Sequence, residues 1–440
     1  MEFKTLEAKC KAKNITEVEI YRIKAEGVSI STFNGVVDNN QIYEKNEMYI
    51  RGVYNGHIVS LYVENDSEDE TDFIVDRIIA NASVTESTDP YFIYGGSKEY
   101  PVIPTEENDY DNYTQADKIA LCQKLEAYLK GKCEFVQMTQ AGVDVETETI
   151  SIENSNGLNV SRTEMGAAIS VAAVIKKDGD TKQGYTVQYL SKLSEFDYDK
   201  LYKEAIERPL SQIGAKSIPS GQYPVVFERK AAASLISCFL SMFSADAYIK
   251  KMCLLADKVG QKVFGDNITF IDDPLHKESI SKYPFDDEGV AAFAKTIVEN
   301  GVLKTYFHNL STAKMLGCES TGNGFKDASG KVSVGPTNLY LKSGDKSFDE
   351  VISPIENGVL ITSMMGQHAG VNAVSGAFSL QAQGFKIENG KVTDPVTLII
   401  VSGNIIDVFN NVVEIANDFE LRRRVGCGSI YVKSLSISGK

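Results

Sequence analysis

The sequence predicts an α+β protein with an N-terminal portion of β-meanders and helices and a larger, mixed α/β C-terminal domain. Two observations predict this class. Runs of alternating apolar and polar residues, separated by short turns, dominate the first half of the chain, and strands alternate with longer helical patterns after Pro224. A chain of 440 residues with 43% hydrophobic residues can form two or three domains. We expect these domains to span residues 1–100, 101–220 and 221–440.

The first domain is predicted to hold a helix, a meander and a second helix. The helices are expected at residues 2–13 and at Asp72–Ala82, where apolar residues recur on one face. Asn55-Gly56 is typical of a type I′ hairpin turn, in which both central residues have positive φ. The strands are expected at Glu17–Lys24, Val28–Phe33, Ile42–Glu44, Glu47–Tyr54 and His57–Glu64.

The central region repeats this order of elements, without any repeat at the level of residues. Helices are predicted at Gln115–Lys130 and Asp197–Gly214. A tight turn is predicted at Lys177–Thr181. The strands between the helices are expected at Glu134–Met138, Val143–Glu153, Leu158–Glu164, Ala167–Ile175 and Tyr185–Ser191.

The C-terminal domain is predicted to mix strands with longer helices. Helical patterns cover most of Glu228–Phe264, all of Asp286–Asn300 and all of Ile405–Phe419. Apolar residues occupy several faces of the first of these segments, which indicates burial. The strands are expected at Pro224–Phe227, Ile268–Ile271, Val302–His308, Asn338–Lys342, Val359–Thr362, Ala377–Glu388, Val396–Val401 and Ser429–Ser436.

Composition restricts the class of partner and the compartment. Asp and Glu number 60 against 45 Lys and Arg, a net charge of -15, which repels phosphate backbones and disfavours nucleic acid as a partner. No apolar stretch reaches the roughly 18 residues of a membrane span, and the N-terminus lacks a secretory apolar core. Seven scattered cysteines without a CxxC pair are typical of reduced thiols, so we expect a cytoplasmic protein.

The segment Gly358–Asn389 is the strongest candidate for a binding site. A glycine-punctuated loop, with Gly366 at its start, separates two strand-like runs and is nearly free of charge. Loop backbone groups need water or a partner, so this loop is expected inside a cavity or against another chain. Its candidate substrate-binding residues are Gly366, Gln367, His368 and Asn372. The alternative is a glycine-rich crossover that only fits between layers.

A second candidate is the short segment Ser320–Gly324. The amides of this segment, with the side chains of Ser320, Thr321 and Asn323, could hold an anion or a peptide backbone. The alternative is a plain turn.

Motifs for metal or nucleophilic catalysis are missing from the sequence. The four histidines share no helix, and HExxH, GxSxG, GxxxxGK[ST] and a strand–helix GxGxxG are all absent. Asp272–His276 has ligand residue types, yet Pro274 favours a turn. The acidic residues from Asp286 to Glu288 are explained by the opening of a helix, and Cys427 by a tight turn between glycines.

Several long blocks resemble the TldD/PmbA family, in which PmbA is also called TldE and which was once described as modulators of DNA gyrase. The resemblance spans nearly the whole chain and is loosest at about residues 90–220. The blocks are GVSISTFNGVVDN (27–39), YIRGVYNGHIVSLYVEN (49–65), IDDP (271–274), PFDDEGV (284–290), ENGVLKTYFHNLSTAKMLGCESTGNG (299–324), PTNLYL (336–341), GVLITSMMGQHAGVNAVSGAFSLQAQGFKIENGK (358–391) and SLSISG (434–439).

The resemblance implies a hollow dimer whose zinc-dependent complexes cut unfolded or leader-type peptides. In the TldD sister, HExxxH lies on the helix after a PVVF-like strand, and a downstream cysteine is a further ligand. Here that helix has Ser237, Cys238 and Ser241 around the ligand positions and lacks both histidines and the glutamate. The departure identifies the chain with the PmbA/TldE side of the family. It implies no metal bound by this chain and a zinc ion in a TldD-like sister subunit.

Three functional hypotheses follow. The chain is the metal-free subunit of a TldD-type metallopeptidase acting on peptides, which leaves open whether it is an enzyme by itself. Alternatively, it is a non-enzymatic protein-binding dimer, including a homodimer, that modulates gyrase or a toxin–antidote protein. The third hypothesis is an independent hydrolase that uses His276, His308 or His368.

Overall fold

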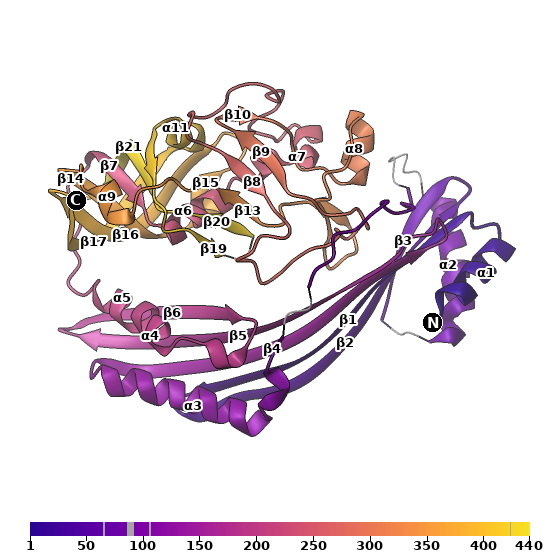
Figure 1. Ribbon diagram of the computed structural model, residues 1–440, viewed down its shortest axis with the longest axis horizontal. Coiled ribbons are helices and arrows are strands. Elements are labelled where there is room, and N and C mark those ends of the chain that lie inside the picture. The colour runs from indigo at the N-terminus through magenta and orange to yellow at the C-terminus, as the bar shows by residue number, and fades with distance from the viewer. Residues whose placement is uncertain (65–66, 86–91, 105–106, 423) are drawn as a thin grey trace. The chain divides into compact units, whose positions relative to one another are not determined.

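The computed structural model describes residues 1–64, 67–85, 92–104, 107–422 and 424–440, which form two compact units (Figure 1). The division into 1–100, 101–220 and 221–440 stays a prediction. Two segments from the C-terminal half of the sequence, residues 280–291 and 325–332, belong to the first unit. The first unit comprises Met1–Ile213, Ile280–Ala291 and Phe325–Val332, and the second comprises Gly214–Ser279, Ala292–Gly324 and Ser333–Lys440.

The first unit is built on one antiparallel sheet with the strand order β3-β2-β1-β4-β5-β6. The hairpin turn at Asn55-Gly56 is confirmed, because both residues have positive φ (51° and 79°). The turn at residues 177–181 is also confirmed, with Asp178 and Gly179 at 52° and 80°. The strands are β1 (Glu17–Phe33), β2 (Val36–Tyr54), β3 (His57–Val63), β4 (Val136–Asn154), β5 (Asn159–Lys177) and β6 (Asp180–Leu190).

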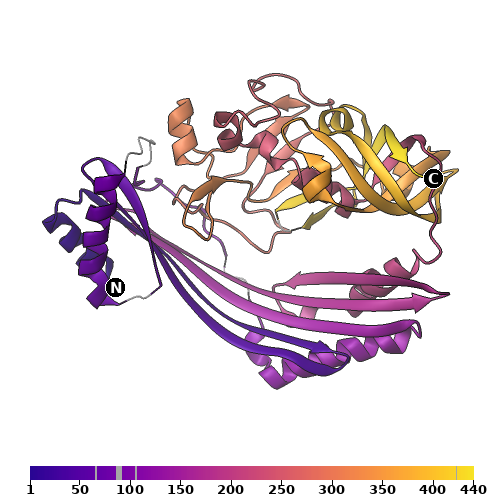
Figure 2. The same cartoon turned by 180° about the vertical axis from the view of Figure 1, so that it is seen from behind.

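Helices cover this sheet at both ends, as Figures 1 and 2 show. One core cluster lies beneath α1 and α2, and another beneath α3 and the helical stretch from α4 to α5. Thr114 and Asp117 form a capping box that begins α3. The helices are α1 (Phe3–Ala12), α2 (Thr71–Val84), α3 (Gln115–Lys132), α4 (Tyr198–Tyr202), the π-turn η4 (Lys203–Glu207) and α5 (Arg208–Leu210), with the 3-10 turns η1 (Glu68–Glu70), η2 (Tyr110–Asn112) and η3 (Leu193–Glu195).

The second unit contains a ring of strands and a second sheet. Strand β14 pairs with both β7 and β16, so the order β14-β7-β21-β17-β16 closes on itself, with β15 and β18 attached. The ring strands are β7 (Gly221–Phe227), β14 (Asn357–Met365), β15 (Val371–Asn372), β16 (Ala377–Glu388), β17 (Lys391–Asn404), β18 (Val412–Ile415) and β21 (Ile430–Ser438). The remaining strands of this unit are β8 (Phe270–Asp272), β9 (Lys295–Glu299), β10 (Val302–Leu303), β13 (Leu339–Leu341), β19 (Glu420–Arg422) and β20 (Val425–Cys427). The hairpin of β11 (Gly324–Lys326) and β12 (Val332–Val334) encloses the segment 325–332 that belongs to the first unit.

The helices of the second unit are short, and α6 is the longest of those described. Its apolar side chains lie in the largest core cluster, which confirms the burial expected for this segment. No helix among the described residues has both the length and the apolar character needed to cross a membrane. The helices are α6 (Arg229–Ser237), the 3-10 turn η5 (Leu240–Phe243), α7 (Ala245–Ile249), α8 (Leu310–Leu316), α9 (Phe348–Ile352), α10 (Gln367–Gly370) and α11 (Ile405–Asn410).

Three predicted helices of the C-terminal half are wrong or too long. In place of a helix at 286–300, the backbone turns after Asp286, whose Oδ1 accepts from the amides of Glu288 and Val290 at 3.0 Å each. This side chain competes with the helix for backbone donors, and the segment continues into β9. Residues 228–264 form α6, η5 and α7 followed by turns, and residues 405–419 form α11 and then β18.

Candidate functional site

The helix that corresponds, by the family resemblance, to the metal-binding helix of the TldD sister is α6, which follows β7 directly. β7 lies parallel to β14 and pairs Val225 with Val359, and the amide of Glu228 donates to the Ile361 carbonyl at 2.9 Å. Alanines 231–233 are buried, so the helix lies close to its neighbours. These contacts fix the position of α6 against the ring of strands.

Two of the three side chains that α6 and the following turn offer are bonded to the helix itself. Ser237 Oγ donates to the Ala233 carbonyl at 2.7 Å, and Cys238 Sγ donates to the Ser234 carbonyl at 3.3 Å. Burial raises the pKa of the Cys238 thiol, which keeps it protonated. Ser241 Oγ is buried and finds no hydrogen-bond partner among the residues described.

The structure brings the glycine loop against α6. Gly366 has a φ of 86° and begins the single turn α10. Gln367 Nε2 donates to the Met364 carbonyl at 2.9 Å and lies 3.4 Å from Ser234 Oγ on α6. His368 is exposed. Asn372 Oδ1 accepts from the amides of residues 374 and 375, at 3.1 and 3.0 Å, so its side chain holds the loop.

The candidates Ser320, Thr321 and Asn323 belong to a different network. Ser320 Oγ and Thr321 Oγ1 both donate to the His308 carbonyl, at 3.2 and 3.1 Å. Asn323 is fully buried and donates to Asp272 Oδ2 at 3.0 Å. All three side chains therefore have bonds inside the protein, as a structural turn requires.

A buried lysine completes this network. Lys295 Nζ donates to Asp272 Oδ2 at 3.2 Å, to the Thr321 carbonyl at 2.7 Å and to Asn323 Oδ1 at 3.0 Å. The charge of Lys295 thus balances that of Asp272 in a site that excludes water. This arrangement stabilises the turn, because the side chains of the turn make hydrogen bonds within the protein.

Cys427, the last residue of β20, has a buried thiol that lies beside the N-terminal end of α6. Its Sγ donates to the Arg229 carbonyl at 3.4 Å. Burial, together with the charges of Asp418 and Glu420, raises the pKa of the thiol far above its ordinary value. Both carboxylates pair with Arg229, at 3.5 and 2.8 Å. A protonated, bonded thiol of this kind is a structural group.

The histidines have separate surroundings. The His276 ring lies 5.0 Å from that of Tyr340 and 5.5 Å from that of Phe419, between centroids. His308 is buried, which lowers its pKa to about 4. Within the ranges that the structure describes, no three His, Cys, Asp or Glu side chains form a group that could hold a metal ion.

One site was missed by the sequence analysis. A cavity of about 550 Å³ lies wholly within the first unit, beside β5. Arg162 and Glu164 of β5 line it, with Phe285 and Lys282 from the segment 280–291. The signal in the sequence is the acidic run beside Pro284, which is also typical of a helix start. Asp287 of that run is in fact bonded to Arg162.

Comparisons with known proteins identify the family. The PmbA/TldA metallopeptidase C-terminal domain matches residues 220–439, and the central domain of the same name matches residues 108–213. These two matches cover most of the chain. The chain belongs to the PmbA/TldD family.

Individual relatives of the PmbA/TldD family agree with this assignment. A metalloprotease PmbA homolog from Buchnera aphidicola is 27% identical over 97% of this chain and 94% of its own. A solved structure from Thermotoga maritima, described as a candidate modulator of a DNA gyrase, is 30% identical with a TM-score of 0.91, and 99% of each chain is covered. TldE from Thermococcus kodakarensis is 22% identical with a TM-score of 0.87, covering 99% of this chain and 100% of its own, which shows the shared fold.

The zinc ion that the family resemblance implies does not fit α6 in this PmbA/TldD member. Zinc requires three or four histidine, cysteinate or carboxylate ligands that converge on one point. α6 and the turn after it provide two hydroxyls and a protonated thiol, and two of these three groups already donate to helix carbonyls. We therefore derive no chemical step through a metal on this chain.

Proposed function

We propose that this chain is the metal-free, PmbA/TldE-like subunit of a TldD-type zinc metallopeptidase complex acting on unfolded or leader peptides. The observation that carries the proposal is α6. α6 follows β7, at the position that the family resemblance gives to the metal-binding helix. The side chains of Ser237 and Cys238, however, donate to carbonyls of α6. A framework associated with metallopeptidases, without ligands at this helix, is suited to a supporting subunit. The zinc ion, its activated water and the general base would come from a TldD-like sister subunit.

The contribution of this chain to such a complex is a wall of the substrate chamber. The turn at Gly366 lies against α6 through Gln367, and His368 and Asn372 are exposed beside it. A chain segment with few charged side chains can bind an extended peptide through backbone hydrogen bonds, independently of the peptide's sequence. This property suits a chamber that accepts unfolded substrates.

The test is a reconstitution with purified subunits. The chain alone, with added zinc, is assayed for cleavage of an unfolded polypeptide, and then again after a TldD-like partner is added. We expect cleavage only with the partner, and none when the partner's HExxxH glutamate is replaced by glutamine. Zinc-dependent cleavage by the lone chain would contradict the proposal.

A second candidate function is that of a non-enzymatic, protein-binding dimer. The description of the Thermotoga maritima relative as a candidate modulator of a DNA gyrase favours it. The net charge of -15 permits a protein partner and disfavours DNA. Binding to gyrase or to a toxin–antidote protein, together with no cleavage in the reconstituted mixture, would support this function over the first.

A further inference from the structure

Half of one long strand in the first unit has an open edge. β5 pairs with β4 over almost its whole length, from Val136↔Ile175 to Glu153↔Asn159. On its other side β6 pairs only from Lys177↔Asp180 to Ala167↔Leu190. No strand in the described ranges pairs with residues 159–166 on that side. The backbone of this segment therefore has a row of groups suited to bond another strand.

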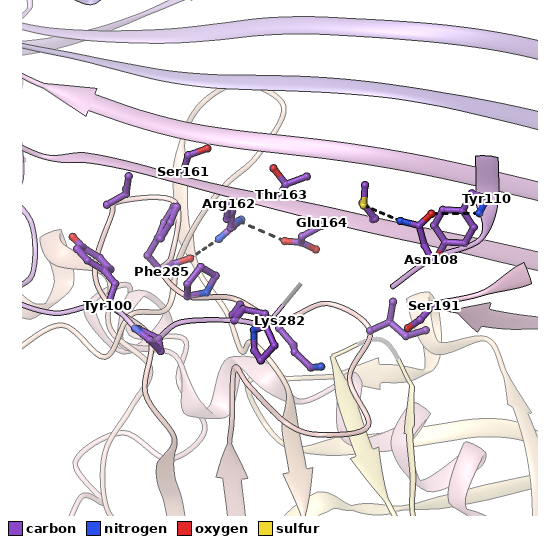
Figure 3. Close-up of a pocket in the computed structure, with 17 residues that line it drawn as sticks. Tyr100, Asn108, Tyr110, Ser161, Arg162, Thr163, Glu164, Ser191, Lys282 and Phe285 are labelled. Carbon is purple, nitrogen blue, oxygen red and sulfur yellow. Dashed lines mark hydrogen bonds and ion pairs between the residues drawn. The ribbon is translucent and has the colours of Figure 1, made fainter. Parts of the chain in front are cut away.

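The open edge lies along the cavity of about 550 Å³, as Figure 3 shows. The opposite wall includes Tyr100, Pro101, Ile103 and Pro104, together with Ile280, Lys282, Pro284 and Phe285. Three of its residues, Pro101, Pro104 and Pro284, have no amide hydrogen and cannot donate to the edge. The wall thus faces the edge without completing the sheet. The cavity volume is in the range of pockets that hold small ligands or a few side chains.

The polar floor of the cavity is rigid and already paired. Arg162 Nη2 lies 3.0 Å from Asp287 Oδ1, and its Nε lies 3.5 Å from Glu164 Oε1. Its guanidinium also lies over the rings of Tyr283 and Phe285, at 5.0 and 5.4 Å from their centroids. Two carboxylates thus compensate the charge of Arg162. The same contacts hold the edge in place before any ligand arrives, which lowers the entropy lost on binding.

The charge next to the edge is negative. Glu148 on β4 lies directly opposite Glu164, and Glu146 points from the same face of β4. Burial raises the pKa of Glu148, the charges of Glu164 and Glu146 raise it further, and Arg162 and Lys45 offset part of this rise. A cationic group bound here would relieve this repulsion.

We propose that the open edge of β5 at residues 159–166, with the cavity beside it, binds an extended, positively charged peptide segment as an additional strand. The peptide continues the sheet in line with β6, places an apolar side chain among the aromatic and proline residues of the cavity, and places a lysine or arginine near Glu148 and Glu164. This binding mode is β-augmentation, in which the main chain gives affinity and the pockets give specificity. The claim that this peptide is a substrate rests on the proposed function. The claim that the peptide binds at β5 concerns only this chain.

The test uses the full-length chain and a fluorescein-labelled, unstructured peptide of alternating valine or threonine and lysine. Binding is followed by anisotropy, and hydrogen exchange locates the protected amides. We expect slower exchange within 159–166, and binding weaker by about tenfold or more when the peptide is N-methylated at alternate residues. Glu148→Gln with Glu164→Gln is expected to weaken binding severalfold, while Glu44→Gln, an exposed carboxylate on the opposite face of the same sheet, has no effect.

Equal affinity of the N-methylated and unmodified peptides, or protection confined to residues 366–376, would overturn the inference. The reconstituted cleavage assay separates this result from the proposed function. Cleavage without binding at β5 contradicts the inference and agrees with the proposed function. Binding at β5 without cleavage in the presence of a TldD-like partner supports the inference and contradicts the proposed function.

Discussion

Arg162 Nη2 of β5 lies 3.0 Å from Asp287 Oδ1, in an ion pair between two buried side chains of the first unit. The pair joins the sheet to a segment from the C-terminal half of the sequence. Asp287 also accepts from the amide of Lys326 at 2.9 Å, so it connects both of the late segments of this unit. The first unit is therefore completed only when residues 280–291 and 325–332 are in place.

We predict that Asp287→Ala lowers the free energy of unfolding by about 3–5 kcal/mol, because the substitution leaves Arg162 buried without its main counter-charge. Urea denaturation followed by fluorescence or circular dichroism measures the change. The matched control is Asp394→Ala, which breaks an exposed pair with Lys386 at 3.0 Å and is expected to cost less than about 1 kcal/mol. Equal effects of the two substitutions would contradict this account of the first unit.

Lys326 predicts a pH dependence of stability. Burial lowers its pKa from 10.5 to about 8, and its Nζ lies 3.7 Å from the centroid of the Tyr21 ring. Between these pH values the unfolded chain holds a proton that the folded chain has released, so the free energy of unfolding rises with pH. Lys326→Met removes this contribution. The stability of wild type relative to the variant should increase from pH 8 to pH 10.5 by at most about 3 kcal/mol.

Urea denaturation of wild type and Lys326→Met across this pH range measures the difference between their free energies of unfolding. The contributions of other titrating groups cancel in this difference. A constant difference in the free energy of unfolding would show that Lys326 keeps an ordinary pKa in the folded state.

Gly384 predicts a steric requirement in the ring of strands. A Cβ at this position would lie 1.8 Å from the Leu360 carbonyl oxygen of β14, so Gly384→Ala forces β14 and β16 apart. We expect a loss of about 1–3 kcal/mol or more. Gly131→Ala in α3 is the control, since its Cβ meets nothing within 4 Å. There alanine should stabilise the helix by about 0.5–1 kcal/mol. Thermal melts of the two variants should shift in opposite directions.

Thiol reactivity distinguishes the cysteines. Cys318 is exposed, whereas Cys427 is buried and its pKa is raised by burial and by neighbouring carboxylates. The reactivity of a cysteine rises with the fraction of its thiol that is deprotonated and with its exposure to the reagent. In the native protein a thiol reagent should modify Cys318 first and reach Cys427 only on unfolding, as peptide mass spectrometry can show. Early modification of Cys427 would mean that the N-terminal end of α6 opens readily.

The elements predicted well from sequence are those with strong local signals. The hairpin at Asn55-Gly56, the helix beginning at Gln115 and the strand Ala377–Glu388 all occur as expected. The segments predicted wrongly are those where side chains compete with the helix. The acidic run at 286 resembles a helix start, yet Asp286 bonds to the amides of its own turn.

The candidate site was predictable only in part. The sequence indicated the Gly366 loop, and its contact with α6 through Gln367 needed the structure. Ser320, Thr321 and Asn323 stay predicted binding residues, and only the structure shows that their side chains belong to a buried network around Lys295. Arg162 could not be singled out, because its partner Asp287 lies 125 residues away in sequence.

The most direct test of the central claim is the metal content of the purified full-length chain. It is measured by inductively coupled plasma mass spectrometry after exposure to excess zinc and gel filtration. The account predicts zinc far below one equivalent in this chain alone, and stoichiometric zinc once a TldD-like partner is bound. A full equivalent of zinc held by the isolated chain would contradict the account.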